Sequence, residues 1–257
     1  MNAARAAFRR LSDLARRAGG GVLDIIYPLS CLVCRRAIAE QGGLCPACWR
    51  EIAFIERPFC ERLGVPFERD LGQPGLISLE AAAHPPVFAR ARAVARYDSD
   101  GARALAYRLK YRDRLELAEP IGRWMARAGA ELLAEADLIA PAPLHRRRLI
   151  ARQFNQSAAL AQVIARESGV PQDPFSLVRV KATSPQVGLS RAQRGANLAG
   201  AFKVTSERVA AVRDRRIVLV DDVLTTGATA NAAARALLRA GAAQVDLLVF
   251  ARAVTSA

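Results

Sequence analysis

The sequence predicts an α/β fold, in which a parallel sheet carries helices on both faces, with a small metal-binding unit before it. Strand-like and helix-like segments alternate from residue 88 onward, and parallel strands need such helical crossovers. Residues 217–220 form an aliphatic run, which is typical of a strand buried on both faces. Four cysteines between residues 31 and 48 predict the separate unit.

Residues 1–21 are expected to form a short basic amphipathic helix that ends in a run of glycines. Such a helix could contact a membrane surface or a nucleic acid, but packing of one face on the body of the protein is the simpler interpretation. A signal peptide is not indicated, because the apolar segment 22–27 is short and contains Asp24. No segment approaches the roughly 18 apolar residues that span a bilayer, so we expect a cytoplasmic protein.

The four cysteines have the spacing of two zinc knuckles. Cys31 and Cys34 form one CxxC pair, and Cys45 and Cys48 form a second. Four thiolates at the corners of a tetrahedron make a closed site, which is typical of structural zinc rather than catalytic zinc. Disulfides are the weaker alternative in a reducing cytoplasm. We therefore predict one structural Zn²⁺ in a ribbon over residues 22–56.

The larger domain is predicted over residues 88–257, after a segment rich in proline and glycine. Its first strand is expected at residues 94–97. Asp98 or Ser99 can cap the helix that follows and that runs to about Tyr111.

A second helix is expected over residues 115–134, with Trp124 and Met125 in the core. The remaining strands are expected at residues 137–140, 202–204, 217–220 and 245–251. One further helix is expected to run to Ser168, and another to cover residues 230–240. The last of these helices is rich in alanine and leucine and ends at Gly241, a natural C-cap.

Asp221 and Asp222 stand side by side directly after the strand at 217–220, and a turn of small and hydroxyl residues follows. Free amides at the start of a helix bind anions, and Gly227 lets a phosphate approach closely. Carboxylates repel phosphate, so the arrangement suits a ligand that presents hydroxyls next to a phosphate, such as ribose 5-phosphate. A strand, turn and helix without any ligand is the alternative, but adjacent acids at a buried edge would then be an uncompensated cost.

Residues 217–229 resemble the PRPP loop of type I phosphoribosyltransferases, which has four hydrophobic residues, two acids and then Thr-Thr-Gly-x-Thr. The resemblance implies that Asp221 and Asp222 are the catalytic acids and hold the ribose hydroxyls of phosphoribosyl pyrophosphate (PRPP). It also implies that the 5-phosphate is bound by Thr225, Thr226, Gly227, Ala228 and Thr229. Mg²⁺ would accompany the pyrophosphate as part of the leaving group.

A zinc ribbon joined to a PRPP loop is similar to the ComF family of competence-associated phosphoribosyltransferases, whose N-terminal part often carries two ribbons. A second ribbon would need thiols at four positions, which here hold Cys60, Leu63, Ile77 and Glu80. We interpret residues 57–87 as a degenerate second ribbon and linker, in which Leu63 and Ile77 replace the metal by an apolar contact. A metal held by Cys60, Glu80 and His84 is the weaker alternative.

Two basic stretches also resemble the ComF family. Residues 141–148 read Pro-Ala-Pro-Leu-His-Arg-Arg-Arg, with Phe-Asn-Gln at 154–156, and residues 109–114 resemble the family's basic turn near pyrophosphate. Guanidinium groups suit a doubly charged pyrophosphate. The resemblance makes His145, Arg146 and Arg147 candidates for this role. A solvated basic turn and a structural histidine remain open alternatives.

The polar, basic stretch 181–202 contains Pro185 and Gly188 and fits a mobile loop better than a core element. By the resemblance it would be a flap that closes over PRPP and excludes water. Closure would bring Gln186, Arg191 and Arg194 near the phosphates.

The formal charge of +14 and the pI near 10.8 indicate polyanionic partners. One hypothesis is an enzyme that transfers phosphoribose from PRPP, with Mg²⁺, to an acceptor that the sequence does not identify. The other is a non-catalytic PRPP-binding module that assists single-stranded DNA uptake together with DNA-uptake proteins. Pyrophosphate release that requires an acceptor would favour the enzyme. Aromatic residues, at 6%, offer few platforms for stacking bases.

Overall fold

The chain divides into two compact units, Met1–Trp49 and Arg50–Ala257. A computed structural model describes residues 29–39, 43–69, 72–73, 75–110, 112–182 and 197–254, without the side chains of residues 112–114. The helix predicted at residues 1–21 lies outside this part of the chain. Among the described helices, none combines the length and the apolar character that a membrane crossing requires.

Four parallel strands from the described residues form the central sheet, in the order β1-β6-β5-β2. They are β1 (Ala91–Arg96), β2 (Leu138–Pro141), β5 (Arg216–Leu224) and β6 (Gln244–Arg252). The predicted parallel sheet is therefore confirmed. β5 is longer than predicted, because its pairing with β6 continues as far as Leu224 opposite Arg252.

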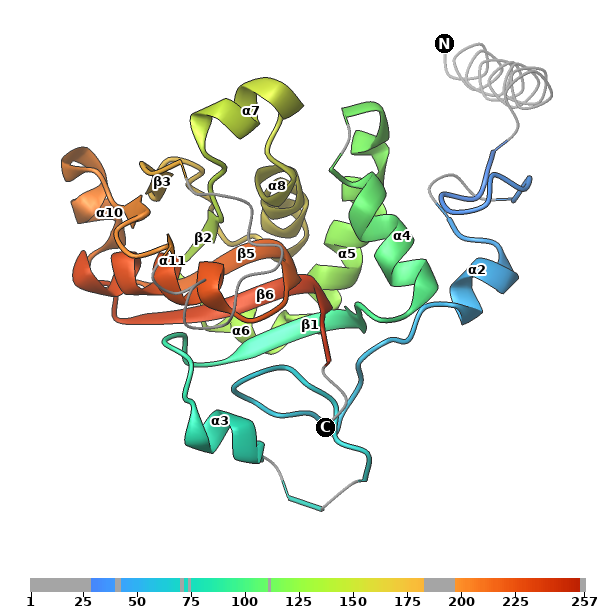
Figure 1. Cartoon of the computed structure of the whole chain (residues 1–257), viewed down its shortest axis with the longest axis horizontal. Coiled ribbons are helices and arrows are strands. Elements are labelled where there is room, and N and C mark those ends of the chain that lie inside the picture. Colours follow the sequence, from blue (N-terminus) through green and yellow to red (C-terminus); the bar gives the residue numbers. More distant parts are fainter. Residues whose placement is uncertain are drawn as a thin grey trace, which may run out of the picture. The chain divides into compact units, whose positions relative to one another are not determined.

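Helices cover both faces of the sheet (Figure 1). Leu247 and Val249 of β6 share one core with α11 (Ala228–Arg239). The ring of Phe250, the next residue of β6, lies 6.5 Å from that of Trp124 in α5 (Ala118–Ala128). Successive side chains of a strand point to opposite faces, so α11 and α5 lie on opposite sides. The prediction of helices on both faces is confirmed, as is the burial of Met125.

The helix predicted over residues 115–134 is divided into three parts. They are the 3₁₀ helix η1 (Arg112–Leu117), α5, and α6 (Ala130–Ala134). Gly129 separates α5 from α6, and a Cβ on it would lie 2.8 Å from the Leu248 side chain. A larger residue here would have to displace the Leu248 side chain, and glycine weakens a continuous helix.

The region between β2 and β5 contains two features that the sequence did not predict. Helix α7 (Arg146–Arg152) occupies part of the expected loop and ends at Gln153, whose φ is 61°. β3 (Val178–Arg179) pairs antiparallel with β4 (Phe202–Lys203). These two strands flank the predicted flap, of which residues 183–196 lie outside the described residues.

Six further helices are described, of which α4 and α8 are the longest. They are α2 (Pro46–Arg50), α3 (Leu79–Ala83), α4 (Asp100–Arg108), α8 (Gln156–Ser168), η2 (Ser206–Arg208) and α10 (Val209–Val212). Ser99 is the N-cap residue of α4, as one of the two predicted alternatives. α8 ends at Ser168 as predicted, and Gly169 follows it with φ of 76°.

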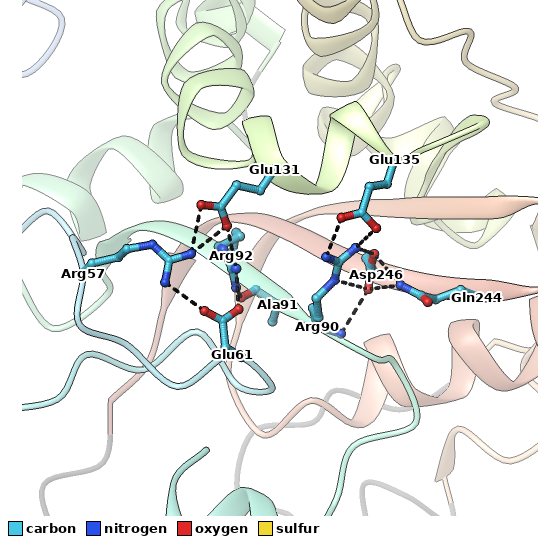
Figure 2. A network of polar contacts seen from close by, with 9 residues as sticks. All are labelled: Arg57, Glu61, Arg90, Ala91, Arg92, Glu131, Glu135, Gln244 and Asp246. Carbon is cyan, nitrogen blue, oxygen red and sulfur yellow. Dashed lines mark hydrogen bonds and ion pairs between the residues drawn. The ribbon is translucent and has the colours of Figure 1, made fainter. Parts of the chain in front are cut away.

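An ion-pair network fixes the Cys60 segment, residues 50–86, to the sheet (Figure 2). Arg92 of β1, with 4% of its side chain exposed, pairs with Glu61 of this segment and with Glu131 of α6. Arg57 pairs with the same two carboxylates at 2.9 and 2.7 Å. The ring of Phe59 lies 4.8 Å from the Arg57 guanidinium and 4.4 Å from that of Arg92. The segment is therefore held by charges that compensate one another, which a buried arginine requires.

The apolar contact predicted between Leu63 and Ile77 is wrong. Leu63 packs with Cys60 and Ala81 in a small buried cluster, whereas Ile77 is 49% exposed. The Ser78 amide donates a hydrogen bond to Cys60 Sγ at 3.2 Å, and Ser78 also caps α3. This places α3, with Ala81, over the sulfur.

Candidate functional site

Asp221 and Asp222 lie within β5 rather than at its end. Asp222 is only 8% exposed and Asp221 is half-buried. The expectation that both acids directly follow the strand is therefore wrong. The reason is the pairing of β5 with β6, which continues through these residues to Leu224.

Hydrogen bonds orient both carboxylates. Ser157 Oγ and the Asp222 amide each donate to Asp221 Oδ1 at 2.9 Å. The Val223 amide donates to Asp222 Oδ1 at 2.8 Å. Asp222 Oδ2 is buried and accepts no hydrogen bond from a described residue, although Lys110 Nζ lies 3.8 Å away. Since buried polar atoms normally have partners, this oxygen is placed to accept one from a ligand.

The Asp222 carboxylate influences the protonation of Asp221. Burial, followed by the neighbouring Asp222 carboxylate, raises the pKa of Asp221 to about 7. Two adjacent carboxylates in a partly desolvated site resist ionising together. A carboxylate with a strongly raised pKa, such as that of Asp221, is typical of functional sites.

The turn after β5 leads directly into α11. Gly227 is the N-cap residue of this helix, with φ of 77°. Glycine adopts this left-handed conformation without the steric cost of a Cβ. Thr225 is exposed, and Thr226, Ala228 and Thr229 are half-buried. Thr226 Oγ1 is a buried atom with no hydrogen-bond partner in the described part of the chain.

The basic stretch after β2 forms the exposed start of α7. Arg146 and Arg147 are exposed, and His145 caps the helix by accepting a hydrogen bond at Nδ1 from the Arg147 amide at 3.3 Å. Asn155 caps α8, where its Oδ1 accepts from the Ser157 amide at 3.1 Å. This cap sets Ser157 in place for its hydrogen bond to Asp221. The flap candidates Gln186, Arg191 and Arg194 lie outside the described residues.

Sequence reasoning missed Arg179 and Ser157. The Arg179 guanidinium lies 5.4 Å from the Phe202 ring. Burial, followed by the charge of Arg148, lowers the pKa of Arg179, while Asp221 raises it. Arg179 thus brings a partly buried positive charge close to the acids. A lone arginine between two valines carries no signal for this position, because only the pairing of β3 with β4 creates it.

The cysteine cluster of the first unit fits zinc. The four sulfurs of Cys31, Cys34, Cys45 and Cys48 lie within 4.8 Å of one another, and Cys34 is the exposed member. A tetrahedral site with Zn–S bonds of about 2.3 Å requires sulfurs about 3.8 Å apart. Burial raises the pKa of Cys31, but hydrogen bonds from backbone amides to its sulfur lower the pKa by more. One of these donors is the Cys45 amide, at 3.3 Å, and the resulting pKa is about 6. Thiolates at this position are therefore favoured, as a metal ligand must be.

Comparisons with known proteins agree with both sites. Two family models match, the double zinc ribbon domain over residues 22–78 and the phosphoribosyl transferase domain over residues 155–256. The chain is 34% identical to the DNA utilization protein YhgH of Salmonella typhi over 228 residues, covering 86% of this chain and 89% of that protein. It is 27% identical to competence protein F of Haemophilus influenzae over 233 residues, covering 88% of this chain and 98% of that protein.

Among solved structures, the glutamine PRPP amidotransferase from B. subtilis, complexed with ADP and GMP, is similar at 20% identity and a TM-score of 0.35. The similarity covers 58% of this chain and 27% of that one. The close relatives extend over nearly the whole chain, and the two family models together match its cysteine cluster and its β5–α11 turn. The chain therefore belongs to the ComF family, whose members join a zinc ribbon to a phosphoribosyltransferase domain.

Proposed function

We propose that the protein binds PRPP and, with Mg²⁺, transfers its phosphoribosyl group to an acceptor. The observation that carries this proposal is the acid pair of β5 directly before the Gly227 turn. Carboxylates bind ribose hydroxyls, and free amides at the start of α11 bind a 5-phosphate. A ribose hydroxyl would give Asp222 Oδ2 the donor that it lacks among the described residues.

The transfer breaks the bond between C1 of the ribose and the pyrophosphate oxygen. Positive charge then develops on the ribose ring, and Asp221 and Asp222 would stabilise it. Arg146 and Arg147 at the start of α7 would attract the departing pyrophosphate, with Mg²⁺ neutralising its charge. We expect Gln186, Arg191 and Arg194 to close over the site and exclude water. The acceptor's nucleophilic atom completes the reaction by bonding to C1.

A calorimetric titration with PRPP and Mg²⁺ tests the ribose assignment. Asp222→Asn keeps an oxygen that can accept from the Val223 amide but removes the charge. A hydrogen bond to a charged group contributes about 1.5–3 kcal/mol, so PRPP affinity is expected to fall roughly 10- to 150-fold. Asp98→Asn is the control, because Asp98 is exposed and pairs with Arg96. Undiminished PRPP affinity in a folded Asp222→Asn variant would refute the role of this residue.

A second candidate is a PRPP-binding module that handles single-stranded DNA without turnover. The names of the relatives, DNA utilization protein and competence protein F, and the charge of +14 favour it. Incubation with PRPP, Mg²⁺ and a panel of bases or ammonia separates the two. Pyrophosphate release that depends on an acceptor supports the transferase, and PRPP binding without release supports the module. A cytoplasmic location and a functional partnership with DNA-uptake proteins belong to this proposal.

A further inference from the structure

Arg252, the last residue of β6, is a buried arginine with 7% of its surface exposed. It lies beside Leu224, the last residue of β5. Its Nη1 donates hydrogen bonds to the main-chain carbonyls of Leu224, Thr225 and Ala253. Its Nε donates to the Leu63 carbonyl at 3.2 Å. A buried charged group needs such partners, and here they connect the end of β5 to the Cys60 segment.

Two of these carbonyls set the direction of amides in the turn after β5. In a planar trans peptide the C=O and N–H groups point in opposite directions, and both peptides concerned are trans. The Leu224 carbonyl shares its peptide with the Thr225 amide, and the Thr225 carbonyl shares its peptide with the Thr226 amide. Since Arg252 holds both carbonyls, the two amides are directed to the opposite side of the turn. No described residue accepts a hydrogen bond from either amide, so both are available to a phosphate.

The charge of Arg252 strengthens the same donors. Hydrogen bonds in series polarise one another inside a protein. A guanidinium bound to the carbonyls of Leu224 and Thr225 therefore makes the amides of the same two peptides better donors. The Ala253 amide also donates to the Leu224 carbonyl, at 2.9 Å, which limits the rotation of that peptide. The turn thus offers a phosphate two aligned amides with a positive charge behind them.

The other anchor of Arg252, the Leu63 carbonyl, belongs to a tight turn of the Cys60 segment. The Gly64 amide donates to the Cys60 carbonyl and the Cys60 amide donates to the Val65 carbonyl, each at 2.8 Å. Gly64 has φ of 64°, and a Cβ on it would lie 3.2 Å from a carbonyl oxygen of β1. The ion-pair network ties the same segment to the sheet (Figure 2). The Leu63 carbonyl is therefore a fixed point for the guanidinium.

We propose that Arg252 is a positioning residue for the 5-phosphate. It holds the turn after β5 against the Cys60 segment, so that the amides of Thr225 and Thr226 are aligned before the ligand arrives. Donors that are already ordered bind a ligand without a further cost of ordering. The inference rests on the proposed PRPP site and adds a residue that acts through the backbone of the turn rather than on the ligand. It also gives the Cys60 segment a function that needs no metal.

Calorimetric titration of Arg252→Met with PRPP, ribose 5-phosphate and pyrophosphate tests the positioning role. Affinity for the two ligands that carry the 5-phosphate is expected to fall roughly 10-fold or more, because charge-assisted hydrogen bonds weaken steeply when misaligned. Pyrophosphate affinity is expected to stay unchanged, since its proposed partners lie on α7. The matched control is Arg62→Met, which removes an arginine bonded to the carbonyls of Pro86 and Phe88. A similar fall in the control, or for pyrophosphate, would mean that Arg252 only stabilises the fold and would overturn the proposal.

Two milder variants carry the same test if Arg252→Met does not fold. Arg252→Lys keeps the charge but places all donors on one nitrogen, so its PRPP affinity is expected to be lower than that of the parent. Gly64→Ala shifts the peptide that contains the Leu63 carbonyl and is also expected to weaken PRPP binding. Its control is Gly75→Ala, where φ is 76° and a Cβ would meet no atom within 4 Å. Unchanged PRPP affinity in both milder variants would refute the positioning role alone, whereas a parent that binds no PRPP would refute the proposed function and this inference with it.

Discussion

Replacing Asp221 with asparagine is expected to stabilise the protein above neutral pH. The folded-state pKa of Asp221 is raised from 3.8 to about 7 by burial and by the Asp222 carboxylate. The folded protein therefore binds a proton that the unfolded chain releases between these pH values. The protonated side chain's contribution to the free energy of unfolding is fully present below about pH 3.8. It is lost progressively as the pH rises from there through about 7. Asparagine cannot ionise, so the stability of the variant does not fall over this pH range.

The magnitude follows from the pKa difference. A rise from 3.8 to about 7 is about three units, which at 1.36 kcal/mol per unit is on the order of 4 kcal/mol at full effect. The amide oxygen of asparagine can still accept the hydrogen bonds from Ser157 Oγ and the Asp222 amide. We therefore expect the parent and Asp221→Asn to have similar unfolding free energies only below about pH 3.8. At pH 5.5 the variant is expected to be more stable by about 2 kcal/mol, and at pH 8.5 by about 4 kcal/mol.

Urea unfolding at the two pH values, followed by tryptophan fluorescence with zinc present, measures this difference. Asp98→Asn is a control of opposite sign, because the guanidinium of Arg96 lowers the pKa of Asp98. That control is expected to lose stability at pH 8.5 rather than gain it. If Asp221→Asn changes the unfolding free energy equally at both pH values, the raised pKa of Asp221 is refuted.

Three other changes test separate parts of the structure. Gly227→Ala is expected to cost about 1–2 kcal/mol in thermal unfolding, because φ is 77° there, and to weaken PRPP binding; an unchanged melting temperature would contradict the strain. Arg92→Met is expected to destabilise the second unit by about 1–3 kcal/mol, since Glu61 loses a charged hydrogen bond but keeps Arg57 as a partner; a neutral result would mean that the network is dispensable. Elemental analysis is expected to find one zinc per chain, and two would indicate a metal at Cys60.

Local composition was sufficient to predict the sheet and the cysteine site. An aliphatic run such as residues 217–220 is buried wherever it lies in the sheet, and the CxxC spacing depends only on nearby residues. The ends of β5 could not be predicted in the same way. Its last residues, including two acids that local propensity places outside strands, remain in the sheet because β6 supplies hydrogen-bonding partners as far as Arg252.

The contacts of the acids were less predictable, because they come from distant parts of the chain. Ser157 lies on α8 and Lys110 lies after α4, yet both approach the acids of β5. Lys110 stood out only as part of a basic turn. Arg179 was missed because the antiparallel pairing of β3 with β4 depends on two residues in each strand. Such short strands have no periodicity that a sequence pattern can reveal.

We expect the two cysteine regions to differ in their need for metal. The apolar cluster around Cys31 contains Cys45 and Cys48 and, in part, Val33, Ile38 and Leu44, which is too little to hold a fold without a staple. Cys60 has a similarly small cluster, but its segment also pairs through Glu61 with Arg92 of the sheet. Contacts with a large, stable unit can replace a metal, whereas contacts within a small one cannot. The loss of ligands beside Cys60 is thus compatible with a folded segment, and chelation should unfold only the region around Cys31.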